Sequence, residues 1–272
     1  MSLKYHINKW RQGLDLLVQL IQRDIAVQYK GSLLGVFWAL LTPLLMLAIY
    51  TIVFGDIFKA RWGTITSGND APSRLDFALN IFCGLIVFNL VSSVLTRAPS
   101  LIVGHANYVK KVVFPLGLLP VVAIGSALVQ TVIALGVLIG VLIASGGVVS
   151  WNAMLVPLVI LPVELATLGV AWLLAALGVF LRDLHHLVMV AVQVLMFLSP
   201  VFYPLEAVPD WLRPALMINP LAWCIEALRE TVLHARLPDW GGWVEQMALA
   251  LALGVAGYTV FRRLRPAFAD IV

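Results

Sequence analysis

Long apolar segments separated by short polar ones make up most of the chain. From Leu33 to Phe54, 22 consecutive residues contain no charge, which at about 1.5 Å per residue spans the roughly 30 Å of bilayer hydrocarbon. Five more apolar segments follow, so we predict an all-α polytopic membrane protein with six transmembrane helices. The predicted spans are residues 33–54, 77–96, 118–144, 154–181, 187–202 and 244–261.

Residues 1–32 show a different, amphipathic pattern. Apolar side chains recur every three or four residues among charged and amide side chains, at Leu3, Ile7, Trp10, Leu14, Leu17, Ile21 and Ile25. This pattern predicts a helix that lies along the cytoplasmic membrane surface with its apolar stripe in the lipid boundary. A helix packed on a soluble domain is the alternative. A cleaved signal peptide does not fit, because the apolar run begins late and is long.

Residues 203–243, before the last span, are broken by Pro209, Pro214, Pro220 and Pro238. Asn219 followed by Pro220 is typical of a helix N-cap and first turn, and predicts a helix from Leu221 to His234. Its charges make a lipid span implausible, so we expect external re-entrant helices. The chain is then one transmembrane domain, 1–272, composed of the interfacial helix (1–32), spans one to five (33–202), the re-entrant region (203–243) and the last span with its tail (244–272).

Charge predicts the orientation. Of the 18 Lys and Arg residues, twelve fall on the face that holds both termini, which the positive-inside rule assigns to the cytoplasm. The segments 64–69 and 205–243 are then external. Tryptophans near the outer ends of spans are typical of an interfacial belt: Trp62, Trp151, Trp211, Trp240 and Trp243. The pI of about 9.2 does not indicate nucleic-acid binding, because the basic residues form no patch or motif.

Few residues are candidates for chemistry. Glu164 is a carboxylate well inside a predicted span, and is either functional or bonded to nearby backbone groups. His185-His186 is interpreted as a solvated turn, and Cys83 and Cys224 as packing residues. The sequence has no P-loop and therefore no ATPase site of that type. Small polar residues either line a path or join helices: Asn89, Ser92, Ser93, Ser126, Gln130, Thr131 and Gln193.

Three segments in one order resemble the membrane subunit of an ABC-2-type exporter, of the group that exports O-antigen, capsule or teichoic-acid chains. They are RDIAVQYKGSLLGVFWALLTPLLM, NYVKKVVFPLGLLP, and RDLHHLVMVAVQVLMFLSPVFYPL continuing through INPLAWCIEALRE. The resemblance implies six helices per subunit, a homodimer, and two copies of a separate nucleotide-binding subunit that binds ATP and Mg. It also implies a lipid-linked glycan substrate and a location in the bacterial cytoplasmic (inner) membrane. We expect this chain itself to bind no cofactor and no metal.

Two groups of residues are the candidate sites. The ATPase-coupling candidates lie in the basic segment from Ala98 to Pro115 and in the later polar turn: Asn107, Tyr108, Lys110, Lys111, Arg182 and Asp183. Their charges alternatively serve only topology. The substrate-path candidates are Tyr50, Phe54 and Glu164, because aromatic rings contact sugar C–H faces, although such residues are also ordinary in membrane helices.

Two classes of function remain open. The favoured one is an exporter permease for lipid-linked polysaccharide, with a drug, lipid or teichoic-acid exporter as the variant. The other is an integral membrane enzyme such as a glycan ligase or acyl transferase. An enzyme needs a compact set of acids, bases or nucleophiles at one membrane face, which this sequence lacks.

Overall fold

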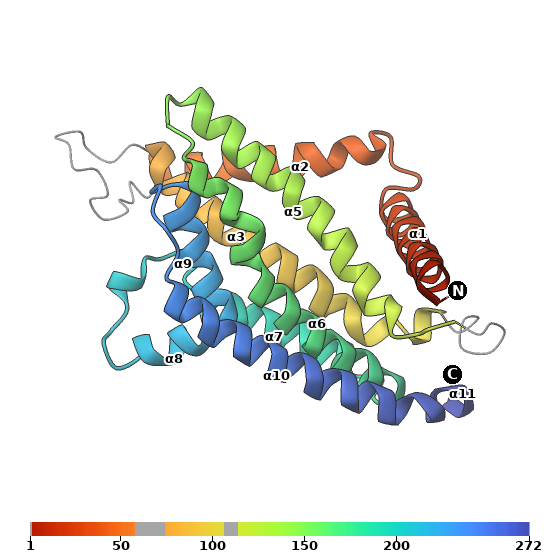
Figure 1. The fold of residues 1–272 in the computed structure, drawn as a ribbon. Helices are drawn as coiled ribbons and strands as arrows, with labels where there is room; N and C mark the ends of the chain where they lie inside the picture. Colours follow the sequence, from red (N-terminus) through yellow and green to blue (C-terminus); the bar gives the residue numbers. More distant parts are fainter. Residues whose placement is uncertain (1, 58–73, 106–113, 272) are drawn as a thin grey trace.

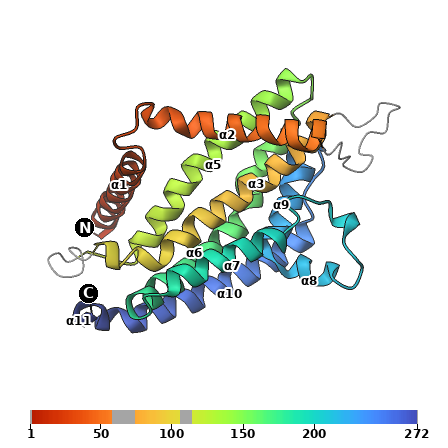
Figure 2. The ribbon, with the colours of Figure 1, turned by 180° about the vertical axis from the view of Figure 1, so that it is seen from behind.

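The computed structural model describes residues 2–57, 74–105 and 114–271, whose regular structure is helical throughout. Helices α3, α6, α7 and α10 lie side by side, and α5 packs against α3 (Figures 1 and 2). The α-helices are α1 Ser2–Gln28, α2 Trp38–Tyr50, α3 Arg74–Arg97, α5 Leu118–Ala144, α6 Val156–Phe180, α7 Leu184–Phe197, α8 Arg213–Ile218, α9 Pro220–Val232, α10 Trp240–Leu264 and α11 Phe268–Ile271.

Four described helical segments are long and apolar enough to cross a bilayer: Leu75–Ser100, Leu118–Ala144, Trp151–Phe180 and Trp240–Ala267. They match the predicted second, third, fourth and last spans, and the chain is a helical multi-pass membrane protein. At the two other predicted spans the apolar helices are shorter, Trp38–Phe54 and Leu184–Phe197. Six spans therefore stay a prediction.

Backbone breaks explain why these two helices are short. Gly35 has a φ of +53°, and a 3-10 turn at Gly35–Phe37 delays α2 until Trp38. The helix then continues as a π-helical stretch over Thr51–Ile57. At the other site α7 ends at Phe197, shortly before Pro200, whose ring disfavours helix at the residue before it.

Both termini lie at one end of the bundle, and α8 and α9 lie towards the other (Figures 1 and 2). The predicted external segment 205–243 contains α8 and α9, and its re-entrant character stays a prediction. Trp151 and Trp211 are 78% and 79% exposed, as membrane-surface anchors would be. The predicted loop 64–69 and Trp62 lie outside the described residues. Cys83 and Cys224 are buried free thiols.

Helices α6 and α10 pack closely because both carry glycine at the crossing. A Cβ placed on Gly257 would lie 1.9 Å from the carbonyl oxygen of Gly169, and one on Gly169 would lie 2.5 Å from the backbone of Leu253. Small residues let backbones approach in this way in membrane bundles, where packing rather than water exclusion drives association. The two glycines therefore fix the distance between α6 and α10.

Helix α9 is held by a buried arginine. Asn219 is the predicted N-cap, and its side chain accepts a hydrogen bond from the Leu221 amide at 3.0 Å. Arg229 is 1% exposed and donates to the carbonyls of Asn80 on α3 and Val201 after α7, each at 3.0 Å. It also pairs with Glu226 at 2.7 Å. The charge is thus satisfied inside the protein, which explains how a charged helix fits among apolar ones.

We predict that Gly257→Val destabilises the bundle by about 1–3 kcal/mol, the usual cost of overpacking a tight contact. The control is Gly254→Val on the same helix, because a Cβ at Gly254 meets nothing within 4 Å. Thermal unfolding of the detergent-purified protein measures the difference. Equal unfolding temperatures for the two variants would disprove the close crossing of α6 and α10.

We predict that Arg229→Met costs about 3–5 kcal/mol, because it removes the buried cation that pairs with Glu226 and donates to two carbonyls. Arg236→Met is the matched control, since the Arg236 side chain is 70% exposed. The loss of stability is measured as the amount of folded protein in membranes and as its unfolding temperature, compared between the two variants. A stable Arg229→Met variant would show that this cluster does not position α9.

Candidate substrate cavity and cytoplasmic face

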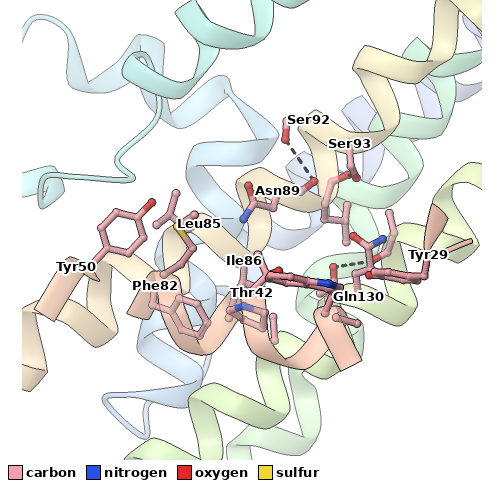
Figure 3. Close-up of a pocket in the computed structure, with 18 residues that line it drawn as sticks. Tyr29, Thr42, Tyr50, Phe82, Leu85, Ile86, Asn89, Ser92, Ser93 and Gln130 are labelled. Carbon is pink, nitrogen blue, oxygen red and sulfur yellow. Dashed lines mark hydrogen bonds between the residues drawn. The ribbon is translucent and has the colours of Figure 1, made fainter. Parts of the chain in front are cut away.

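A cavity of about 440 Å³ lies between the end of α1 and helices α2, α3 and α5 (Figure 3). Each helix contributes residues about one turn apart, as a single helix face does. On α2 the face consists of Trp38, Thr42, Met46 and Tyr50, together with Ala39 and Pro43. The remaining lining residues are Tyr29 directly after α1; Phe82, Leu85, Ile86, Asn89, Leu90, Ser92 and Ser93 on α3; and Ala127, Gln130, Thr131 and Ala134 on α5.

The cavity brings together most of the small polar residues that the sequence singled out. Five of those seven line it: Asn89, Ser92, Ser93, Gln130 and Thr131. Ser126 is buried and Gln193 is exposed on α7, and neither lines the cavity. The Asn89 side chain is exposed although it belongs to a span, so its amide needs water or a polar ligand as partner. The cavity is therefore suited to a hydrated or hydroxyl-rich occupant.

Four aromatic residues line the same space: Tyr29, Trp38, Tyr50 and Phe82. Tyr29 and Tyr50 lie at opposite ends of the labelled residues in Figure 3, so aromatic rings are present at both ends of the cavity. Tyr29 is partly buried, which raises the pKa of its hydroxyl, so this hydroxyl stays neutral near neutral pH. None of the 18 lining residues shown in Figure 3 is charged. Rings with hydroxyl and amide groups suit an uncharged, hydrogen-bonding ligand better than a phosphate.

The other two predicted substrate-path residues, Phe54 and Glu164, do not line the cavity. The Phe54 ring packs against Phe77 and Phe202, with centroids 5.7 and 6.2 Å away, and is not among the lining residues. Glu164 is half-buried on α6 and does not line the cavity. Sequence reasoning missed Trp38, although it lies three helical turns before Tyr50 on one face of α2. Trp38, Thr42, Met46 and Tyr50 recur every four residues, and this spacing was the available signal.

The predicted ATPase-coupling residues are only partly described. Asn107, Tyr108, Lys110 and Lys111 lie outside the described residues. Arg182 and Asp183 are exposed at the turn after α6, and the Asp183 carbonyl accepts hydrogen bonds from the His186 and Leu187 amides. Their role in coupling stays a prediction.

The start of the predicted coupling segment, which runs from Ala98 to Pro115, packs against the end of α6 near the Arg182-Asp183 turn. A 3-10 turn at Ala98–Ser100 follows α3, and a Cβ on Gly178 would lie 2.1 Å from the Pro99 carbonyl oxygen. Ile102 in the following turn is fully buried. Gly178 is one helical turn before Arg182, so the base of the segment and the Arg182 turn lie against the same end of α6.

Among the described residues there is no group of three His, Cys, Asp or Glu that could hold a metal ion. His185 and His186 are both exposed, with ring centroids 5.8 Å apart, but they lie in the first turn of α7 and not in the turn that the sequence predicted, which ends at Asp183. The cavity thus offers binding groups, and its lining has no nucleophile paired with a base.

Comparison with known proteins identifies relatives across almost the whole chain. The profile of the family described as ABC-2 type transporter matches residues 15–233. The O-antigen export system permease protein RfbA of Myxococcus xanthus is 29% identical over 259 residues, 94% of this chain and 95% of that protein. A protein of the same name from Klebsiella pneumoniae is 25% identical over 282 residues, 100% of both chains. The polysialic acid transport protein KpsM of Escherichia coli is 24% identical over 236 residues, 81% of this chain and 82% of that protein.

We predict that the cavity is reached by water. With Cys83 and Cys224 replaced by Ala, the variants Asn89→Cys and Ser93→Cys should react with a water-soluble maleimide in membrane vesicles. Val87→Cys on the same helix is the control, because Val87 is 1% exposed and does not line the cavity. If Asn89→Cys reacts as slowly as Val87→Cys, the cavity is dry and cannot hold a hydrated ligand.

Proposed function

This chain belongs to the ABC-2 type transporter family, and we propose that it is the membrane permease subunit of an exporter that moves lipid-linked polysaccharide across the bacterial cytoplasmic membrane. Members of this family are transport permeases. The observation that supports the substrate class is the uncharged cavity, lined by four aromatic residues and five small polar ones. Its relatives include proteins named for O-antigen export and for polysialic acid transport.

The cavity is proposed as part of the glycan path. Aromatic rings contact the C–H faces of sugars without requiring one hydroxyl pattern, and side-chain amides and hydroxyls exchange hydrogen bonds with many hydroxyls. A polymer that slides needs contacts that are favourable but weak, as for ions in a channel. Tyr50 is the predicted path residue that lines the cavity. For Phe54 and Glu164 the structure offers no such support.

The energy for transport is proposed to come from a separate ATPase. The 272-residue sequence contains no P-loop, so ATP and Mg would bind to two copies of a partner subunit. The contact is proposed to include the segment from Ala98 to Pro115, with Asn107, Tyr108, Lys110 and Lys111, and the neighbouring Arg182-Asp183 turn. Both termini would lie in the cytoplasm with this face, as the twelve basic residues indicate.

The permease is proposed to act as a homodimer, with α7 at the interface. Helix α7 has 14 residues, about 21 Å, and is too short to cross the membrane alone. Most of its circumference is exposed, including Leu187, Val190, Val194 and Phe197. The exposed Gln193 amide on this helix would lack a partner in lipid, whereas a second copy of α7 could supply one.

The test of this function is deletion of the gene in its native bacterium. We expect loss of surface polysaccharide and accumulation of the lipid-linked glycan inside, both reversed by the wild-type gene. Tyr50→Ala should lower surface polysaccharide by about two- to tenfold, which corresponds to the ~0.5–1.5 kcal/mol of one aromatic contact. Tyr50→Phe keeps the ring and is the matched control.

Purification of the tagged permease should also recover an ATPase in a two-to-two complex. Unchanged surface polysaccharide in the deletion strain would refute the substrate class. Normal export by Tyr50→Ala, in a strain where deletion abolishes surface polysaccharide and the wild-type gene restores it, would remove only the Tyr50 ring from the path.

A further inference from the structure

Four polar side chains from three helices form one continuous hydrogen-bonded chain. Arg97 of α3 donates from Nη2 to Oδ1 of Asp24 on α1 at 2.6 Å. The other carboxylate oxygen of Asp24 accepts from Nε2 of Gln28 at 3.1 Å. Oε1 of Gln28 in turn accepts from Nε2 of Gln130 on α5 at 2.6 Å. We call Arg97, Asp24, Gln28 and Gln130 the α1 relay.

One end of the relay is joined to the coupling segment. Arg97 is the last residue of α3, and the turn Ala98–Ser100 that follows is seated on α6 through Pro99 and Gly178. Because Arg97 and Pro99 are two residues apart, a displacement of the segment's base must move the guanidinium or stretch its bond to Asp24. The 2.6 Å contact between opposite charges is the strongest link of the relay.

The other end of the relay is the cavity wall. Gln130 lines the cavity, and so does Tyr29, the neighbour of Gln28 in sequence. In Figure 3, Gln130 and Tyr29 are labelled on the same side of the view, away from Tyr50. The end of α1 therefore lies at the cavity. The Gln130 amide, which lines the cavity, is hydrogen-bonded to Gln28 of α1.

Helix α1 reaches this position because α5 has a glycine where they touch. A Cβ on Gly125 would lie 2.3 Å from Cδ1 of Ile21, so the apolar stripe of α1 packs directly on the α5 backbone. Ile21, Asp24 and Gln28 lie on one face of α1, three or four residues apart. Apolar packing sets the distance between α1 and α5, and the polar relay sets the register of α1 along the bundle.

Asp24 is charged in this setting. Partial burial raises the pKa of its carboxyl, but the hydrogen bonds and charge of Arg97, with smaller contributions from Ser126 and Gln28, outweigh that effect and hold the pKa below its ordinary value. The side chain is 20% exposed, so the ion pair is only partly screened by solvent. The relay thus persists at neutral pH.

We propose that the α1 relay transmits movement of the cytoplasmic coupling segment to the cavity wall, so that Asp24, Gln28, Arg97 and Gln130 are positioning residues for transport. The proposal rests on the proposed permease function. With the relay formed, α1 holds Gln130 and Tyr29 at that end of the cavity. When the ATPase displaces the segment, Arg97 moves, Asp24 and Gln28 follow with α1, and Gln130 is released towards the substrate.

The experiment measures polysaccharide exported per ATP hydrolysed by the permease–ATPase complex in proteoliposomes loaded with lipid-linked glycan. Gln28→Leu and Gln130→Leu should each lower this ratio by about 2- to 30-fold, the range of coupling energies in such networks, while ATPase binding is unchanged. Because Gln28→Leu already breaks the bond that Gln130→Leu breaks, the double variant should be no worse than Gln28→Leu alone. Asp24→Arg should lower the ratio, and Asp24→Arg with Arg97→Asp should recover it.

Matched controls use exposed residues of α1 outside the relay. Gln19→Leu controls for the loss of an amide, and Asp15→Arg for the charge change. If the role of α1 is purely structural, the relay variants will yield less folded complex. The complex that does fold will then export as much polysaccharide per ATP as the wild type, and this result would overturn the proposal. Independent, multiplicative losses in Gln28→Leu and Gln130→Leu would overturn it as well. Absence of glycan transport by the wild-type complex would instead refute the proposed function.

Discussion

The buried guanidinium of Arg229 is the constraint on which the arrangement of this molecule depends. A charge inside an apolar bundle is tolerated only where it is fully paired, and Arg229 is paired by α3, by the chain after α7 and by its own helix. Gly84 of α3 leaves room for it, because a Cβ there would lie 3.0 Å from Nη2. At about 100° per residue, Asn80 and Gly84 lie on the face of α3 opposite to Phe82, Ile86 and Asn89. The arginine that fixes one side of α3 therefore orients the cavity wall on the other.

Apolar periodicity predicts helices well and their breaks poorly. The bounds expected for α5, Leu118–Ala144, are those observed, since Pro115-Leu116-Gly117 and Ser145-Gly146-Gly147 punctuate both ends. Asn219 was recognisable as a cap for the same local reason. The run from Leu33 to Phe54 looked like one uniform span because hydrophobicity does not record backbone conformation. Neither the positive φ of Gly35 nor the π-helical stretch from Thr51 is visible in the hydrophobic pattern.

The cavity was foreseeable in composition but not in geometry. Asn89, Ser92, Ser93, Gln130 and Thr131 are visible as polar positions within spans, yet the same pattern fits residues that join helices. Whether these residues line a cavity or join helices depends on how far apart α2, α3 and α5 lie. That distance cannot be predicted from the sequence of one helix. Tyr50 and Phe54 illustrate the limit. They are one helical turn apart in sequence and their ring centroids lie 6.2 Å apart, yet Tyr50 lines the cavity while the Phe54 ring packs on Phe77 and Phe202 and does not line it.

The distribution of charge accounts for how such a chain can hold a polymer without trapping it. Two ionic contacts hold helices in the described bundle: the buried Arg229 pairs with Glu226, and the partly exposed Arg97 pairs with Asp24. The cavity between them is lined by rings, hydroxyls and amides, each of which contributes a contact that a passing hydroxyl-rich chain can exchange for the next. A positive charge in this wall would bind any anionic group too tightly to release it, since low-dielectric surroundings strengthen the attraction. The ionic contacts hold helices together and are absent from the cavity lining, so the contacts that we propose to transmit force are separate from the surface that we propose to contact the substrate.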